Sequence, residues 1–129
     1  MSYNSALQMY VVNNTGGNAV FSFSHMYTGD PAQIFQSTTP VAPGAFVGPL
    51  TVGFNTGFGH SGTDYWYCQA QVIDGPNEGF YHTEGSLQNP SKECEGQAAD
   101  DGMVYYFPFS RSSFVMPLLS GPCSTSVST

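Results

Sequence analysis

Six residues between positions 55 and 67 carry the side chains best suited to hold a polar ligand. The six are Asn55, Phe58, His60, Asp64, Tyr65 and Tyr67. Amide, imidazole and carboxylate groups can hydrogen-bond to hydroxyl groups, and a tyrosine ring has a flat apolar face and a polar tip. Together these groups are typical of a surface that stacks on a sugar ring and orients its hydroxyls.

The sequence carries no motif of a known catalytic site. It has no nucleophile elbow, phosphate-binding loop, Cys-x-x-Cys pair or zinc-protease motif. A small hydrolase that uses His60, His82, Glu84 or Arg111 is one alternative, because strands can bring distant residues together. We expect a protein that binds a ligand without converting it and that needs no cofactor.

Calcium is the one metal ion that the sequence suggests. Asp74, Asn77 and Glu78 lie in one predicted turn, and Ca²⁺ prefers such oxygen ligands. However, Asp-Gly turns form for local backbone reasons alone, and the spacing matches no EF-hand. Calcium binding is therefore an alternative, and we expect no metal among the six predicted ligand-binding residues.

The predicted ligand-binding residues depend on a strand between Asp64 and Ile73. Successive side chains of a strand point to opposite faces. One set faces the predicted core and consists of Trp66, Cys68, Ala70 and Val72. The other set is Tyr65, Tyr67, Gln69 and Gln71. We expect this tyrosine–glutamine face to be open to solvent beside the glycine-rich loop that holds His60.

Seven further segments are predicted as strands from their alternation and flanking turns. They are Leu7–Val12, Ala19–Tyr27, Ala32–Gln36, Ala45–Phe54, Phe80–His82, Met103–Phe109 and Ser113–Leu119. We expect the first two to pair as a hairpin and the fourth to bend at Gly48-Pro49. Met103–Phe109 is apolar on both faces, which predicts a central strand. Residues 84–102 are predicted to form a surface excursion with a short helix near Cys94 to Ala99.

These elements predict a single all-β domain over residues 1–129. Many short strands separated by turns, without an amphipathic helix, are typical of an antiparallel β-sandwich. A β-barrel is the second possibility. A β-trefoil is the third, because it requires three similar segments and we find none. Within this domain, His25 is interpreted as a strand histidine whose ring nitrogens have partners in the protein.

The composition excludes several classes of partner. The 129 residues are 40% hydrophobic, 15% aromatic and 9% charged, with a formal net charge of -7. Lys92 and Arg111 are the only cations, so the chain lacks the positive charge that binding to nucleic acid or to anionic lipid requires. A membrane partner would have to be contacted through exposed aromatic side chains such as Phe58.

The three cysteines leave one unpaired. Cys68 falls on the predicted core face and is interpreted as a buried thiol, whereas Cys94 and Cys123 lie in polar segments and could form a disulfide. The chain begins without a signal peptide and has no apolar stretch long enough to span a membrane. We expect a cytoplasmic protein or the mature form of a secreted one.

Ten Phe, eight Tyr and one Trp are more aromatic residues than a core of this size usually needs. Alternation leaves four tyrosines on faces that it does not bury, namely Tyr65, Tyr67, Tyr81 and Tyr106. In its size, acidity, aromatic content and Met-Ser-Tyr start, the chain resembles the small β-sandwich lectins and cytolysins of fungi and bacteria, such as aegerolysins and actinoporin-like lectins. The resemblance implies recognition of a glycan or a lipid headgroup.

The leading hypothesis from the sequence is thus a lectin-like, non-catalytic binding protein. A membrane-active cytolysin that uses Phe58 is the first alternative. A structural protein, in which an aromatic face is an interface between subunits of an oligomer, is another.

Overall fold

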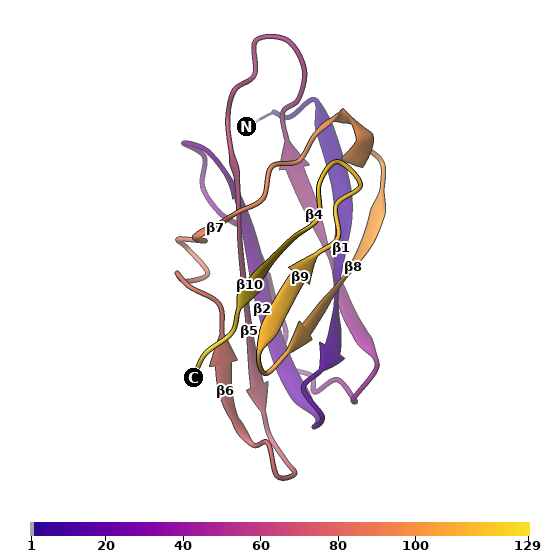
Figure 1. Ribbon diagram of the computed structural model, residues 1–129, viewed down its shortest axis with the longest axis vertical. Helices are drawn as coiled ribbons and strands as arrows, with labels where there is room; N and C mark the ends of the chain where they lie inside the picture. Colours follow the sequence, from indigo (N-terminus) through magenta and orange to yellow (C-terminus); the bar gives the residue numbers. More distant parts are fainter. Residues whose placement is uncertain (1) are drawn as a thin grey trace.

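Residues 2–129, which the computed structural model describes, form ten β-strands and one short 3-10 helix (Figure 1). The strands are β1 (Ser5–Asn14), β2 (Ala19–Tyr27), β3 (Gln33–Gln36), β4 (Phe46–Phe54), β5 (Asp64–Val72), β6 (Gly79–His82), β7 (Lys92–Glu93), β8 (Val104–Ser110), β9 (Ser113–Met116) and β10 (Cys123–Ser126). The helix is η1 (Ala98–Asp100). Each strand predicted from the sequence is present within a few residues.

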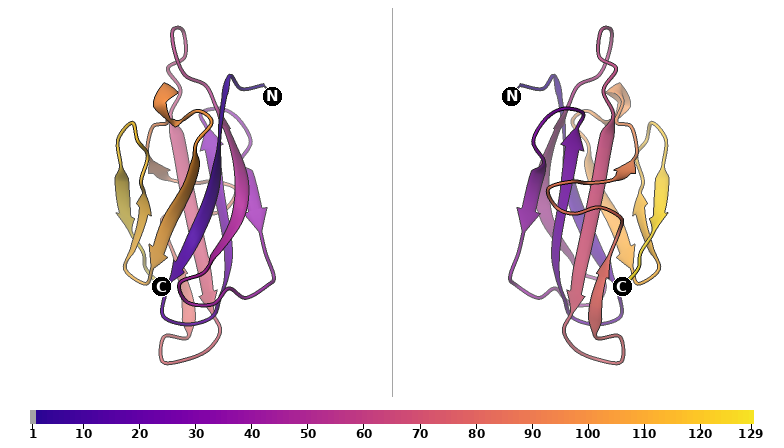
Figure 2. Two further views of the ribbon diagram at one scale, coloured as in Figure 1. Left: turned by 90° about the vertical axis from the view of Figure 1, so that its right-hand side faces the viewer. Right: turned by 90° about the vertical axis from the view of Figure 1, so that its left-hand side faces the viewer.

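The strands form two sheets that pack face to face. Sheet A has the order β10-β9-β8-β1-β4, and sheet B has the order β3-β2-β5-β6, with β7 also paired to β5. Neighbouring strands are antiparallel except for β1 and β8, which are parallel. The two sheets share no strand, and each view of Figure 2 shows one sheet in front of the other, so the fold is the predicted β-sandwich and not a barrel or a trefoil.

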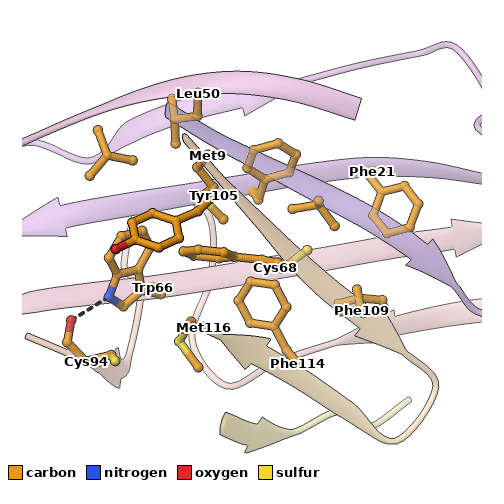
Figure 3. Close-up of a cluster of buried hydrophobic side chains, with 14 of the residues drawn as sticks. Met9, Phe21, Leu50, Trp66, Cys68, Cys94, Tyr105, Phe109, Phe114 and Met116 are labelled. Atoms are coloured by element: carbon orange, nitrogen blue, oxygen red, sulfur yellow. Dashed lines mark hydrogen bonds between the residues drawn. The ribbon is translucent and has the colours of Figure 1, made fainter. Parts of the chain in front are cut away.

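The core lies between the two sheets and follows from side-chain alternation. On β5 every inward side chain from Trp66 to Val72 is buried, as predicted. Figure 3 shows Met9, Tyr105 and Phe114 of sheet A packed against this strand. The indole N–H of Trp66 donates to the carbonyl oxygen of Cys94 at 2.8 Å, so its one polar atom is satisfied inside the core.

The expected hairpin between the first two strands is wrong. β1 lies in sheet A between β8 and β4, and β2 lies in sheet B between β3 and β5. Both strands have an apolar inward side, and opposing sheets bury both sides at once. Asn13 stabilises the turn that carries the chain from sheet A to sheet B. Its side-chain amide donates to the carbonyl oxygens of Gly17 and Val41, each at 2.8 Å.

β4 carries the predicted irregularity at Gly48-Pro49. This peptide bond is cis, Gly48 has a φ of 141°, and the pairing with β1 shifts register between Met9 and Val11. A Cβ atom at Gly48 would lie 2.8 Å from the carbonyl oxygen of Met9, so glycine is required there. Leu50 beyond the bend faces the core, whereas Phe46 before it is 55% exposed.

The C-terminal segment contains a strand that the sequence did not reveal. Residues from Ser120 onward read as a polar tail, yet β10 pairs antiparallel with β9 over Cys123–Ser126. Cys123 also forms a disulfide with Cys94, and Cys68 is a buried free thiol, so both interpretations of the cysteines are confirmed. Burial raises the pKa of the Cys68 thiol well above its ordinary value.

The outer face of sheet B is partly covered. The segment between β6 and β7 passes in front of β5 in the right-hand view of Figure 2. Pro90 within this segment is buried, and so is Ser24 on the outward side of β2. The predicted surface excursion therefore seals part of the sheet, and its helix is a single 3-10 turn at Ala98–Asp100.

Among residues 2–129 we find no helix with the length and apolar character needed to cross a lipid bilayer.

Candidate functional site

The glycine-rich loop between β4 and β5 projects from one end of the sandwich (Figure 1). Its base is fixed by Asn4, whose backbone N–H donates to Oδ1 of Asn55 at 2.9 Å and whose side-chain amide donates to the carbonyl oxygen of Thr56 at 2.7 Å. Phe58 and His60 near the tip are exposed, and the Phe58 side chain has no cover at all. Asn55 therefore holds the loop in place, while Phe58 and His60 face solvent.

Asp64 does not join this loop at the surface but is buried against His25. Nε2 of His25 lies 2.6 Å from Oδ1 of Asp64, and Oδ2 of Asp64 accepts from the backbone N–H of Gly96 at 2.8 Å. His25 is 0% exposed and Asp64 is 1% exposed. No substrate can reach this pair, so it stabilises the fold and is not a catalytic dyad.

The imidazole ring of His25 is oriented by its neighbour Gln33. The Gln33 amide is oriented by Gly53, since its Nε2 donates to the Gly53 carbonyl oxygen at 3.0 Å and its Oε1 accepts the Gly53 N–H at 2.9 Å. Oε1 also lies 3.1 Å from Nδ1 of His25, so Nδ1 must carry a proton. The contact between Nε2 of His25 and Oδ1 of Asp64 then completes a chain of polar contacts that runs from Gly53 through Gln33 and His25 to Asp64.

The tyrosine–glutamine face of β5 is not the open surface that the sequence predicted. Tyr67 is only 4% exposed, its hydroxyl donates to Oε1 of Gln69 at 2.9 Å, and burial raises the pKa of the phenol. Tyr65 is half-buried. The six predicted residues therefore divide into two exposed, two half-buried and two buried side chains, and they do not form one binding surface.

The aromatic surface that is open lies on the outer face of sheet A. Tyr10 on β1, Phe46 on β4 and Tyr106 on β8 have ring centroids 5.1 to 5.4 Å apart. The two tyrosine rings are stacked with an interplanar angle of 14°, and Phe46 meets both edge to face. Phe46 is 55% exposed and Tyr106 is 46% exposed. We call these three residues the aromatic platform.

The polar atoms of the platform are free to bind a ligand. The hydroxyls of Tyr67 and Tyr81 donate to groups of the protein, whereas those of Tyr10 and Tyr106 have no hydrogen-bond partner within residues 2–129. Gln8 precedes Tyr10 on the same side of β1 and accepts a hydrogen bond from Thr51 through Oε1 at 3.0 Å. That bond leaves both N–H groups of the Gln8 amide available.

The outward side of β1 connects the platform to a hollow at each end. The outward residues are Ala6, Gln8, Tyr10, Val12 and Asn14. Ala6 lines a hollow of about 530 Å³, which we call the Tyr3 depression; its lining is completed by Tyr3, Asn4, Ser5, Gln33, Thr51, Gly53 and Asp101. At the strand rise of a β-sheet, Ala6 to Asn14 spans about 27 Å.

The hollow at the other end is more polar, and we call it the Arg111 pocket. It measures about 360 Å³ and is lined by Asn14, Thr15, Gly16, Asn77, Ser110, Arg111 and Ser112. These residues come from the turns after β1, β5 and β8, which converge at one end of the sandwich (Figure 1). The lining includes a cation, hydroxyls and amides, and no carboxylate.

The described residues include no cluster of side chains placed to hold a metal ion. No group of three or more His, Cys, Asp or Glu residues within positions 2–129 is placed to hold a metal ion. Asp74 of the suggested calcium turn instead accepts hydrogen bonds from the side chain and the backbone of Asn18, which lower its pKa. His60, His82 and Arg111 lie on a loop, a strand and a different turn.

Sequence reasoning found only one member of the platform, Tyr106, and placed the candidate site on the other sheet. A signal for Tyr10 was present, because Leu7, Met9 and Val11 define the inward side of its strand and leave Tyr10 outward. Phe46 gave no such signal, because the bend at Gly48 interrupts the alternation of its strand. Comparison with protein-family models and with curated protein sequences finds no match.

Proposed function

We propose that this protein is a non-catalytic, lectin-like module that binds a glycan along the outer face of sheet A. The observation that supports it best is the aromatic platform, whose three rings lie together on the surface and have no packing role in the core. An exposed aromatic cluster of this kind is typical of a recognition site. Its outward neighbours on β1 and β8 are Gln8, Val12, Val104 and Pro108, so an amide and uncharged apolar groups lie beside the rings and can contact the polar and apolar sides of a sugar.

The shape of the surface supports a ligand of several sugar units. The platform lies midway between the Tyr3 depression and the Arg111 pocket, and both hollows offer hydrogen-bonding groups. In the Tyr3 depression, Oδ1 of Asp101 accepts from the backbone N–H of Ala6 at 2.9 Å, which leaves Oδ2 for a sugar hydroxyl. A chain stacked on the platform can therefore extend in either direction along β1.

A glycan array followed by calorimetric titration tests the proposal. We expect Tyr106→Ala to weaken binding of the best glycan about tenfold or more, because covering an aromatic side chain contributes about 1.5–3 kcal/mol. Phe80→Ala is the matched control, since Phe80 is 40% exposed on β6 of sheet B. That variant should bind as the wild type does. Absence of any glycan ligand, or equal effects of the two variants, would count against the proposal.

The same face could instead join two copies of the chain, and the experiment separates the two cases. Light scattering of the wild type and of Tyr106→Ala reports the mass of each in solution. A dimer that dissociates in the variant, with no glycan bound by the wild type, would replace the lectin proposal with an interface between subunits.

Membrane contact through the loop between β4 and β5 is a second candidate function. Its support is the complete exposure of Phe58 between two glycines of positive φ, Gly57 at 93° and Gly59 at 85°. Pelleting with neutral phosphatidylcholine vesicles tests it, and Phe58→Ser should abolish the pelleting. The glycan affinity should be unchanged in this variant, because the platform is formed by other strands.

A further inference from the structure

We propose that the glycan carries an acidic group, a sugar carboxylate or a sulfate ester, which binds in the Arg111 pocket while a neighbouring sugar stacks on the aromatic platform. This inference rests on the proposed function and names its ligand class more narrowly. It follows from the composition of the pocket, from its position along β1 and from the placement of the two cations of the chain.

The pocket is the place on this surface where an anion is favoured. Arg111 is exposed, and no carboxylate lies within ion-pair distance of it, since the only ion pair among residues 2–129 is the buried His25–Asp64 pair. Nine acids outnumber two cations in the chain, yet none of the nine lines this pocket. A guanidinium presents a planar fork of N–H donors that matches a carboxylate or a sulfate.

Neutral groups of the pocket complete the site around the guanidinium. Asn14 and Ser110 lie opposite each other at the ends of the parallel strands β1 and β8. The side-chain amide of Asn77 donates to the carbonyl oxygen of Thr15 at 3.2 Å, which ties the turn after β5 to the turn after β1. The pocket wall is thus held by contacts between turns and does not have to form when a ligand arrives.

The register of β1 and β8 places the pocket and the platform close enough together for one ligand to contact both. Tyr10 is opposite Tyr106, and four residues later Asn14 is opposite Ser110. The intervening pair, Val12 and Pro108, has the same outward direction and carries no charge. Four residues of strand cover about 13 Å, so an acidic sugar in the pocket and a stacked sugar on the platform belong to one short oligosaccharide. The Asp101 carboxylate at the opposite end of the surface disfavours the reversed orientation.

The test compares acidic oligosaccharides with their uncharged parents. Sialylated, uronic-acid and sulfated glycans are titrated against the wild type, each beside the same glycan without the acidic group. We expect at least one acidic glycan to bind about tenfold tighter than its parent, a ratio typical of a charge-assisted bidentate contact. The ratio should fall between 50 mM and 500 mM salt, because an exposed charge is screened. Comparison of the affinities for the carboxylated and the sulfated glycans shows which anion is preferred.

Arg111→Gln should reduce the ratio to about one, because a neutral amide removes the charge that distinguishes the acidic glycan from its uncharged parent. Lys92→Gln is the matched control, since it removes the other cation from β7 of sheet B and changes the net charge equally. Its ratio should remain that of the wild type. Arg111→Lys should keep only part of the preference, because an ammonium lacks the planar fork.

The outcomes separate this inference from the proposed function. Equal binding of acidic and uncharged glycans by the wild type, or a ratio that Arg111→Gln does not change, overturns the acidic-ligand inference and leaves the platform as a site for neutral glycans. Absence of binding to every glycan overturns both.

Discussion

At the scale of single residues, the buried His25–Asp64 pair is the most demanding feature of the core. Two groups that can each be charged are removed from water, and they are tolerated because Gln33 and Gly96 satisfy their outer atoms. Removal of one partner leaves the other buried without compensation, which costs more than the pair itself contributes.

We therefore expect Asp64→Asn to lower the free energy of unfolding by about 3 kcal/mol. The shape is preserved, but an amide has only one oxygen, whereas the carboxylate contacts Nε2 of His25 through Oδ1 and accepts from the backbone N–H of Gly96 through Oδ2. Urea titration followed by tryptophan fluorescence measures the change, since Trp66 is the single tryptophan and its ring centroid lies 4.6 Å from that of His25. Glu78→Gln, at an exposed position, is the control. Equal stabilities of Asp64→Asn and Glu78→Gln would refute the role assigned to the pair.

The predictions of which side chains are buried were correct where alternation along a single strand was sufficient to decide. Alternation assigned Trp66 and Cys68 to the core, and both are buried. It also assigned Tyr67 to the opposite face of β5, which is correct, but it could not tell that residues between β6 and β7 cover that face. The exposure of a sheet face depends on segments distant in sequence, and periodicity within the strand does not report on them.

At the scale of elements, Asp100 joins η1 to β8 and to the segment before β10. Its carboxylate accepts hydrogen bonds from the Tyr105 hydroxyl, from the hydroxyl and backbone N–H of Ser120 and from the backbone N–H of Gln97. Burial raises the pKa of Asp100, but these hydrogen bonds lower it further, and the pKa lies below its ordinary value of 3.8. The folded protein therefore stabilises the ionised form of Asp100 more than the unfolded chain does.

This pKa shift predicts a loss of stability in acid. The contribution of Asp100 is complete above pH 3.8, where the unfolded chain is ionised too, and it disappears as the pH falls below 3.8 through the lower pKa of the folded state. Asp100→Asn should be less stable by about 2 kcal/mol at pH 7 and should show a smaller further loss between pH 4 and pH 2. Urea titrations of both proteins at a series of pH values check this. Parallel pH profiles would contradict it.

The order and type of the elements were largely predictable, but their assignment to sheets was not. The turn between β1 and β2 has the composition of a hairpin turn, yet the strands separate because β4 and β8 occupy both edges of β1. β10 escaped notice because its sequence, Cys-Ser-Thr-Ser, has almost no apolar signal. It forms because the disulfide and the ladder with β9 hold it in place.

At the scale of the whole molecule, the Cys94–Cys123 disulfide joins the segment after β7 to the edge strand of sheet A. The bond closes a loop of 29 residues that includes β8 and β9. Closure restricts the unfolded chain, and a loop of this length contributes about 3.5 kcal/mol in the chain-entropy description.

The double variant Cys94→Ala/Cys123→Ala should therefore unfold at a lower urea concentration, with a loss of about 3.5 kcal/mol. Wild type treated with a reductant should behave in the same way. Thiol counting supplies the control, because Cys68 should react only after unfolding, since it is fully buried. Unchanged stability of the double variant would show that non-covalent contacts alone hold β10.

The candidate site also belongs to this scale, which is why the sequence did not place it. Tyr10, Phe46 and Tyr106 are separated by 36 and 60 positions and meet only because β1 lies between β4 and β8. The excess of aromatic residues indicated that such a surface exists. Its location required the strand order.

The side-chain amide of Gln33 affects whether another molecule can add a strand to the edge of sheet A. It hydrogen-bonds to both the N–H and the C=O of Gly53 on β4, an edge strand of sheet A, as the backbone of a neighbouring strand would. At the other border, His82 and Ser128 exchange two backbone hydrogen bonds, each 2.9 Å. Unpaired N–H and C=O groups on an edge strand can pair with a strand of another molecule. At Gly53 and at His82 the backbone groups are therefore already paired, and a strand from another molecule would have to displace these contacts before it could pair there.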